Sequence, residues 1–416
     1  MRKRFHLAGV LLCLVTACPA TAHGETADHA ELVQRIDASL AAACTFMLDH
    51  QAEDGGWYSD RYGCFRTGPT LTPYVMSALW FMPQAGPEAP TAYRRGVSSL
   101  TRLVGEDGKL DVGRREWIFP VYTSAMASRV VVLQERTDEN LRAQQAWLEY
   151  LLARQLTEDL GWRPEDLEYG GWGFALDLPR KPPPGRPKEF FHESNLAATV
   201  FGLAALKSAR TPRDHPAYAK ALRFVKRCQN FAETADAADP DFDDGGFFFI
   251  PADPVQNKAG VAGTDRRGRQ RYHSYGTMTA DGIRALMSAG LPPDHPRVVA
   301  ARRWLEKNFS AKENPGAFPG DRAVLQNATY YYWTWAVAHA FMALRVDEFE
   351  TASGERVQWP VALAEEVLRR QRPDGAWVNR FTDAKEDDPL VATPWAAASL
   401  AICRSMITHE RPVLGK

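Results

Sequence analysis

The chain has little cysteine, almost no net charge and no long apolar run in its body. Its 416 residues include six cysteines, and no Cys-x-x-Cys or Cys/His cluster has zinc spacing, so neither a metal nor another cofactor is expected. Its 50 basic and 51 acidic residues give a net charge of -1, which argues against nucleic acid as a partner. No stretch beyond the N-terminal segment has 18 uninterrupted apolar residues, so no membrane-spanning helix is expected.

The N-terminus has the pattern of a targeting segment. A basic start at residues 2–4 precedes an apolar run, Leu7 to Val15, and the small residues Ala20-Thr21-Ala22. This pattern predicts a signal peptide over residues 1–22. Residues 15–18 also fit a bacterial lipoprotein signal, in which Cys18 would carry the lipid and tether the protein to a membrane. Either alternative predicts an exported bacterial protein that is periplasmic, secreted or lipid-anchored.

Four cysteines remain after the predicted signal. Cys44 and Cys64 could form a disulfide in an oxidising compartment. Cys228 and Cys403 lie on apolar helical stretches, where packed thiols are expected.

What the chain does have is a repeated phrase: an acidic or turn residue, one or two glycines, and an aromatic residue. Four clear copies occupy residues 54–57, 169–172, 244–247 and 374–377, and weaker copies occupy 107–110 and 314–318. The ends of the phrases are roughly 50–75 residues apart, a spacing that indicates a repeat array of about six units.

Each phrase lies between two helical patterns of different kinds. The preceding patterns are amphipathic: Glu31–Gln51, Tyr93–Gly105, Asn140–Leu156, His215–Asn230, His295–Phe309 and Trp359–Gln371. The following patterns are apolar on nearly every side: Thr72–Met82, Val121–Leu133, Asn195–Ala209, Tyr275–Ala289, Tyr330–Leu344 and Val391–Cys403. A helix that is apolar all round must be buried all round.

Six amphipathic helices that alternate with six helices apolar on all sides predict two concentric rings. The fold is therefore expected to be all-α, an (α/α)6 barrel or toroid. A single domain is expected over residues 31–403, followed by a C-terminal tail, 404–416. The glycines would end the outer helices in the left-handed conformation, and the aromatic residues would pack across each turn.

These phrases and helices resemble the QW repeats of squalene-hopene cyclases and their relatives, the α/α toroids of terpenoid cyclases and protein prenyltransferases. The resemblance covers residues 31–403, with the chain most similar to single-toroid, exported bacterial members. It implies a central apolar cavity that binds or converts an isoprenoid. The prenyltransferases hold a catalytic zinc through an Asp, a Cys and a His, and this sequence has no upstream Asp-x-Cys to match.

One acidic motif within the repeats carries a candidate chemistry. Asp241-Phe242-Asp243-Asp244 matches the DxDD pattern of class II terpene cyclases, and the resemblance makes Asp243 the proton donor with Asp241 and Asp244 beside it. Crowded carboxylates can keep one proton near neutral pH. Asp244 is also the acidic residue of a phrase, so a structural role stays open. A third interpretation is a calcium loop, since Asp239, Asp241 and Asp243 alternate.

Two long loops point to a binding face. Residues 178–191 are rich in proline, and residues 251–273 contain glycines and a basic run, 266–271, that would suit an acidic ligand or be solvated. Both lie between a phrase and its second helix, so both are expected on one face of the ring. The candidate binding residues at these helix starts and on the apolar helices are His192, Glu193, Asn195, His273, Tyr275, Tyr331, Trp335 and Trp395.

The sequence leaves three functions open. The first is a cyclase-like enzyme (an isomerase or lyase) or a binder of a hydrophobic isoprenoid. The second is a secreted glycan-binding or carbohydrate-active barrel, since α/α barrels also serve sugar enzymes. The third is a non-catalytic scaffold for a protein partner. A fold-level resemblance does not choose among them.

Overall fold

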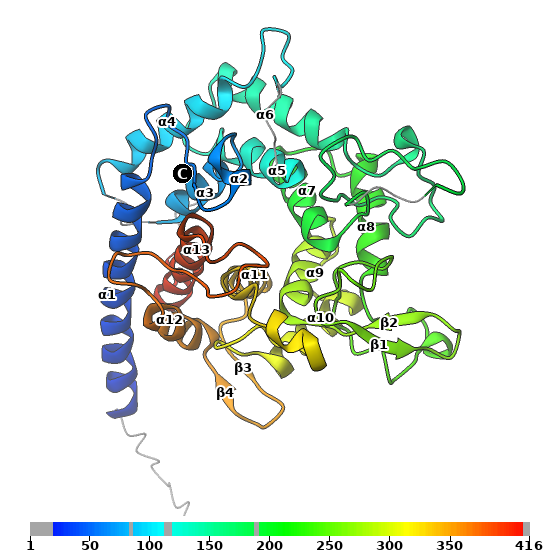
Figure 1. The fold of residues 1–416 in the computed structure, drawn as a ribbon. Coiled ribbons are helices and arrows are strands. Elements are labelled where there is room, and N and C mark those ends of the chain that lie inside the picture. Colours follow the sequence, from blue (N-terminus) through cyan, green and yellow to red (C-terminus); the bar gives the residue numbers. More distant parts are fainter. Residues whose placement is uncertain (1–19, 83–85, 112–118, 187–190, 411–416) are drawn as a thin grey trace, which may run out of the picture.

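The computed structural model describes residues 20–82, 86–111, 119–186 and 191–410. Six helices form a closed inner ring, in which each contacts the next and the last contacts the first. They are α3 (Thr72–Phe81), α5 (Pro120–Val130), α7 (Leu196–Ser208), α9 (Gly276–Ser288), α11 (Tyr330–Leu344) and α13 (Pro389–Thr408). Figure 1 shows the molecule viewed along the axis of this ring. The predicted (α/α)6 toroid is confirmed, and the apolar helices are the inner ones.

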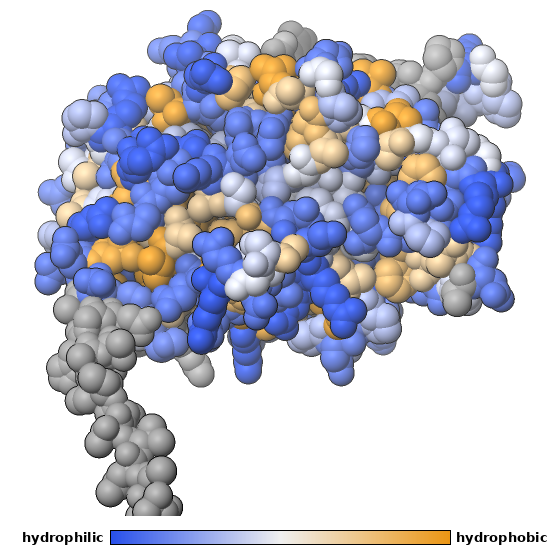
Figure 2. Space-filling view, turned by 90° about the horizontal axis from the view of Figure 1, so that it is seen from below, coloured by the Kyte–Doolittle hydropathy of each residue, from blue (hydrophilic) through white to orange (hydrophobic). Residues whose placement is uncertain are grey.

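The amphipathic helices form the outer ring. They are α1 (Ala20–Asp49), α4 (Ala89–Thr101), α6 (Asp138–Leu152), α8 (Pro216–Arg227), α10 (Pro296–Asn308) and α12 (Trp359–Arg369). Each packs against at least one inner helix. Figure 2 shows one side of the molecule, where hydrophilic residues cover most of the surface and apolar residues form small separate groups. The outer helices thus keep one wet face, as their periodicity predicts.

Four glutamines join consecutive units at the phrases. The Gln51 amide donates to the carbonyl of Gly55 in its own turn and to Ala92 in the next outer helix, at 2.9 and 2.7 Å. Gln155, Gln229 and Gln371 make the same pair of bonds in their units. The partner of Gln371 is Ser39 in α1, so the last unit closes the ring on the first.

The aromatic residue of each phrase is fixed from two sides. The Trp172 indole donates to Leu151 O in the outer helix at 2.8 Å, and its backbone N–H donates to Thr199 in the inner helix at 3.1 Å. Trp57 and Trp377 repeat both bonds, and Phe247 repeats the backbone one. The phrases therefore bind an outer helix, an inner helix and the next unit together.

Strands are peripheral in the described part of the chain. The hairpin of β1 (Val261–Thr264) and β2 (Gln270–Tyr272) and that of β3 (Phe349–Glu350) and β4 (Arg356–Val357) both lie outside the inner ring. Three short segments, α2 (Gly63–Arg66), η1 (Glu158–Leu160) and η3 (Gly320–Leu325), lie in loops, as does η2 at 235–237.

The structure tests the predictions for the two ends of the chain and for its cysteines only in part. Residues 1–19, including Cys18, lie outside the described residues, so the signal stays a prediction. Helix α13 runs to Thr408, five residues past the predicted end of the toroid. It is also long and apolar enough to cross a membrane, but 78% of that window is buried inside the ring. Cys44 and Cys64, whose pairing the sequence leaves open, are not joined by a disulfide in the described chain.

Candidate active site

A cavity of about 500 Å³ opens at one end of the ring axis. Its lining comes from the first turns of all six inner helices and from the loops before them. Phe191 of one long loop and Lys258 of the other line it, which confirms that the two loops share a face. The volume is within the range of small-molecule sites.

The lining of this cavity is rich in aromatic residues. Tyr122 stacks on Phe174 with ring centroids 5.4 Å apart, and Tyr74 meets Trp395 edge-to-face at 5.1 Å. Below them Phe201 stacks on Trp335 at 5.6 Å. The aromatic lining residues are Phe65, Tyr74, Phe119, Tyr122, Phe174, Phe191, Phe249, Tyr275, Tyr332 and Trp395. Such a surface binds apolar ligands and can stabilise a cation through ring faces.

One carboxyl group in the lining is almost fully buried. Glu386 is 1% exposed and lies in the loop before α13. Its Oε1 accepts the Tyr332 N–H at 2.8 Å, and its Oε2 accepts the Tyr331 N–H and the Asn379 amide, both at 3.0 Å. Burial raises the pKa of Glu386 to about 7 against these bonds. Oε1 thus keeps one lone pair for a proton.

A second buried carboxyl group lies behind the wall. Asp281 on α9 is fully buried and accepts a 2.6 Å hydrogen bond from the Tyr332 hydroxyl. It also forms an ion pair with Arg284 at 2.7 Å. Burial raises the pKa of Asp281 to about 6, although Arg284 and Tyr332 oppose the shift. Tyr332 therefore joins the cavity to a titratable group that does not itself line it.

Three cations line the same cavity. Arg322 donates to the carbonyls of Val255 and Asn257 at 3.0 and 3.1 Å. Lys385 lies over the rings of Tyr62 and Phe119, at 5.3 and 5.7 Å from their centroids. Burial lowers the pKa of Lys258, opposed by the nearby carboxyl groups of Asp383 and Glu386.

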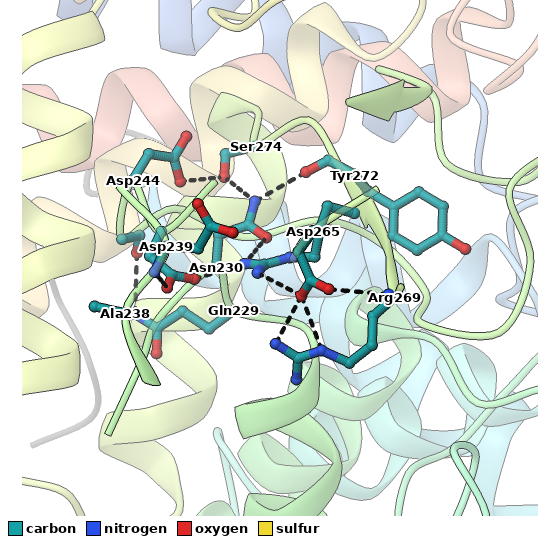
Figure 3. A network of polar contacts seen from close by, with 12 residues as sticks. Gln229, Asn230, Ala238, Asp239, Asp244, Asp265, Arg269, Tyr272 and Ser274 are labelled. Carbon is teal, nitrogen blue, oxygen red and sulfur yellow. Dashed lines mark hydrogen bonds and ion pairs between the residues drawn. The ribbon is translucent and has the colours of Figure 1, made fainter. Parts of the chain in front are cut away.

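Asp243, the predicted acid, lies outside this cavity in a polar network around the β1–β2 hairpin. Its carboxylate accepts from Arg271 at 2.6 Å and from the Asp239 N–H at 2.7 Å. The network, part of which is labelled in Figure 3, includes Asp265, which is bonded to Arg269. Both of these contacts of Asp243 lie outside the cavity lining. This geometry favours a structural role for Asp243.

The other two acids of the motif also lie away from the cavity lining. Asp244 accepts from the Gly246 N–H, the Ser274 hydroxyl and the Trp304 indole at 3.0, 2.7 and 3.0 Å. Asp54 and Asp374 accept the same hydrogen bond from the backbone N–H two residues later. Asp244 therefore stabilises the turn of its phrase. Asp241 is exposed.

The alternating acids do not form a calcium loop. The Asp239 carboxylate is paired with Arg266, and no group of metal-ligating residues occurs in the described part of the chain. The basic run thus neutralises the acids of its own network.

The remaining predicted binding residues divide into two groups. Tyr275 and Trp395 line the cavity, and Trp335 supports it from below. His192, Glu193, Asn195, His273 and Tyr331 are not in the lining. Asn195 instead caps α7 by accepting the Ala198 N–H at 2.8 Å, and the Tyr331 hydroxyl donates to Val378 O at 3.3 Å.

Sequence reasoning missed Glu386, Asp281, Lys258, Arg322 and Lys385. The available signal was position within the repeat. Every lining residue that belongs to a unit with a clear phrase follows the aromatic end of that phrase. Glu386 opens the acidic run 386–388 after the last phrase, whereas Asp243 precedes the glycines of its phrase, in the loop that follows α8.

Comparisons with known proteins agree with the fold. No family model and no curated sequence matches the chain. It is similar to the type II terpene cyclase MstE from Scytonema, with TM-score 0.55 and 13% identity to the complex with geranylgeranyl dihydroxybenzoate, over 90% of this chain and 99% of that chain. The complex of that enzyme with merosterolic acid A gives 0.54 and 16% over the same shares.

An unsaturated glucuronyl hydrolase from Bacillus sp. GL1 is also similar, with TM-score 0.51 and 11% identity over 92% of this chain and 98% of that chain. These likenesses show the fold of the chain, an α/α toroid. A hydrolase shares it, so the fold alone does not define the chemistry.

Proposed function

We propose that the protein binds an isoprenoid in the central cavity and protonates one of its double bonds, with Glu386 as the acid. The observation that carries the proposal is a buried carboxyl group in an aromatic cavity. Burial raises the pKa of Glu386 to about 7, so a proton is available near neutral pH. Enzymes with such chemistry place ring faces around the cation that forms.

The proposed step needs no cofactor. The Glu386 proton forms a C–H bond at one alkene carbon and leaves a carbocation at the other. Ring closure moves the positive charge along the chain, and loss of a proton restores neutrality. The net reaction is an isomerisation. Tyr332, hydrogen-bonded to Asp281 at 2.6 Å, is the group in the lining best placed to pass that last proton onward.

The test is incubation with geranylgeraniol in D2O, followed by mass spectrometry of the products. We expect cyclised isomers that carry one deuterium. Glu386→Gln should abolish them while the protein stays folded by circular dichroism. Asp243→Asn is the matched control and should retain turnover, since Asp243 lies outside the cavity. Loss of turnover in Asp243→Asn but not in Glu386→Gln would return the acid role to the DxDD motif.

A carbohydrate-active function is the second candidate. It is favoured by the cations Lys258, Arg322 and Lys385 in the lining, because an acidic sugar needs such partners and aromatic rings stack on sugar faces. An unsaturated glucuronyl disaccharide is the discriminating probe. Its hydrolysis, in the absence of any reaction with geranylgeraniol, would favour this alternative.

We also propose that the protein is exported, on the basis of the basic and apolar N-terminal pattern. Mass spectrometry of the mature protein from bacterial cells tests this. Cleavage after residue 22 supports a secreted or periplasmic form, and a lipid on Cys18 supports an anchored one. An intact Met1 terminus would contradict export.

A further inference from the structure

Within the described chain, the three cations of the cavity form no ion pair with a carboxylate group, in contrast to the basic residues around the β1–β2 hairpin. Arg269 and Arg271 are each paired with aspartate. Among the described residues, Arg322 bonds only carbonyl oxygens, and Lys385 lies only over aromatic rings. Lys258 has no hydrogen bond or ion pair there. Cations in or near a cavity that are not held in ion pairs can bind an anion.

A neutral polar group adds to this unbalanced lining. The Thr277 hydroxyl is in the first turn of α9, lines the cavity and has no hydrogen-bond partner among the described residues. Its residue is 1% exposed, so bulk water does not satisfy it. A buried hydroxyl without a partner is costly, and a ligand oxygen would remove that cost.

The direction of the inner helices acts in the same sense. All six begin at the cavity end, because the lining comes from their first turns or from the residues just before them. Helix N-termini carry partial positive charge and favour anions. The acids Asp383 and Glu386 share the lining, but two helix N–H groups hold Glu386. Three cations and six helix starts outweigh them.

We propose that the ligand of this cavity has an apolar body and one compact anionic end, a carboxylate or a phosphate, that lies among Lys258, Arg322 and Lys385. The inference rests on the proposed function and names the chemical class of its substrate. The apolar body occupies the aromatic walls, and the anionic end faces the loops. Thr277 supplies one hydroxyl to an oxygen of the ligand.

The test is a matched ligand series with one hydrocarbon chain: geranylgeraniol, geranylgeranoic acid and geranylgeranyl monophosphate. Binding is followed by quenching of tryptophan fluorescence, since Trp395 lines the cavity. We expect at least one of the two anions to bind about tenfold or more tightly than the alcohol, as is typical of charge-assisted hydrogen bonds. The two anions separate a carboxylate site from a phosphate site.

The variant Lys258→Met removes one charge and keeps the length of the side chain. It should weaken binding of the preferred anion at least about fivefold more than it weakens binding of geranylgeraniol. Lys385→Met should do the same and serves if Lys258→Met does not fold. The matched control is Lys109→Met, because the Lys109 side chain is 81% exposed and lies outside the cavity lining. It should behave as the wild type.

Two results would overturn the inference in different ways. Equal affinity of the wild type for the alcohol and both anions, within threefold, rejects the anionic end but leaves the isoprenoid function intact. Absence of binding by all three ligands rejects the proposed function and this inference with it. An equal loss in Lys109→Met and Lys258→Met would assign the preference to general charge rather than to the cavity.

Discussion

At the scale of single residues, position in the repeat determines which acid reaches the cavity. Asp243 and Glu386 both lie in short acidic runs, and the motif pattern favours Asp243. Asp243 lies in the loop that follows α8, and its carboxylate accepts a hydrogen bond from Arg271 of the β1–β2 hairpin. Glu386 comes after its phrase and reaches the N-terminus of α11. The sequence predicted an acidic residue as the candidate acid. Which acidic residue reaches the cavity could be seen only from the positions of the loops in the structure.

Glu386 should make stability depend on pH. Burial raises its pKa to about 7 from 4.5, so the folded protein binds this proton more tightly than the unfolded chain. The resulting stabilisation is fully present below pH 4.5 and is lost as the pH rises through 7. Its full size is at most about 3 kcal/mol. Urea unfolding between pH 4.5 and 7.5 should show this decline in the wild type and a flatter profile in Glu386→Gln.

Glu355→Gln is the control for this titration. Glu355 is exposed in the turn between β3 and β4, away from the cavity. Its substitution should leave the profile of the wild type unchanged. If Glu386→Gln retains the same decline as the wild type, another group causes the decline, and the expected titration of Glu386 is rejected.

At the scale of elements, the phrases were predictable because they depend on local chemistry. Helical periodicity located all twelve helices of the two rings. Their predicted ends agree with the structure to within about four residues, except at the N-terminus of α1 and the C-terminus of α13. The bonds of each glutamine to two carbonyls follow from the end of an outer helix. The β1–β2 hairpin and its aspartate–arginine network were not predicted, because they depend on contacts between distant loops.

Glycine in a phrase should be irreplaceable for a steric reason beyond its dihedral angle. Gly170 has φ +94°, and a Cβ atom there would lie 2.0 Å from the carbonyl oxygen of Lys220 in the next outer helix. Gly170→Ala should therefore destabilise the protein by more than about 3 kcal/mol, since the backbone of α8 must move. Thermal unfolding followed by circular dichroism measures the loss.

Gly268→Ala separates the two causes. Gly268 also has positive φ, +75°, but a Cβ there would meet nothing within 4 Å. It should cost only the backbone strain, about 1 kcal/mol. Equal losses in the two variants would mean that close packing between units contributes nothing.

At the scale of the whole molecule, the ring is closed by contacts between its first and last helices. Arg404 on α13 pairs with Asp37 on α1 at 2.6 Å, and both side chains are mostly buried. Arg35 on α1 pairs with Glu365 on α12 at 2.7 Å, but both are about half exposed. The two concentric rings predicted from the helix pattern imply that the first and last units meet. The pattern could not predict which charges would cross the seam between them.

The two ion pairs across this seam should differ in strength. Arg404→Met should lower the free energy of unfolding by about 1–3 kcal/mol, because it leaves a mostly buried Asp37 without its partner. Arg35→Met is the matched substitution on the exposed pair and should cost less than about 1 kcal/mol. Urea denaturation provides both values. A larger loss for Arg35→Met would contradict the dependence on burial.

In each unit with a clear phrase, the residues that line the cavity come after the turn whose glutamine holds neighbouring units together, although both lie between an outer and an inner helix. The connections that contain these lining residues can lengthen, shorten or change sequence without disturbing the hydrogen bonds that maintain the barrel. Evolution or protein design can therefore change the ligand preference of this barrel through these connections alone, while the rest of the sequence stays the same.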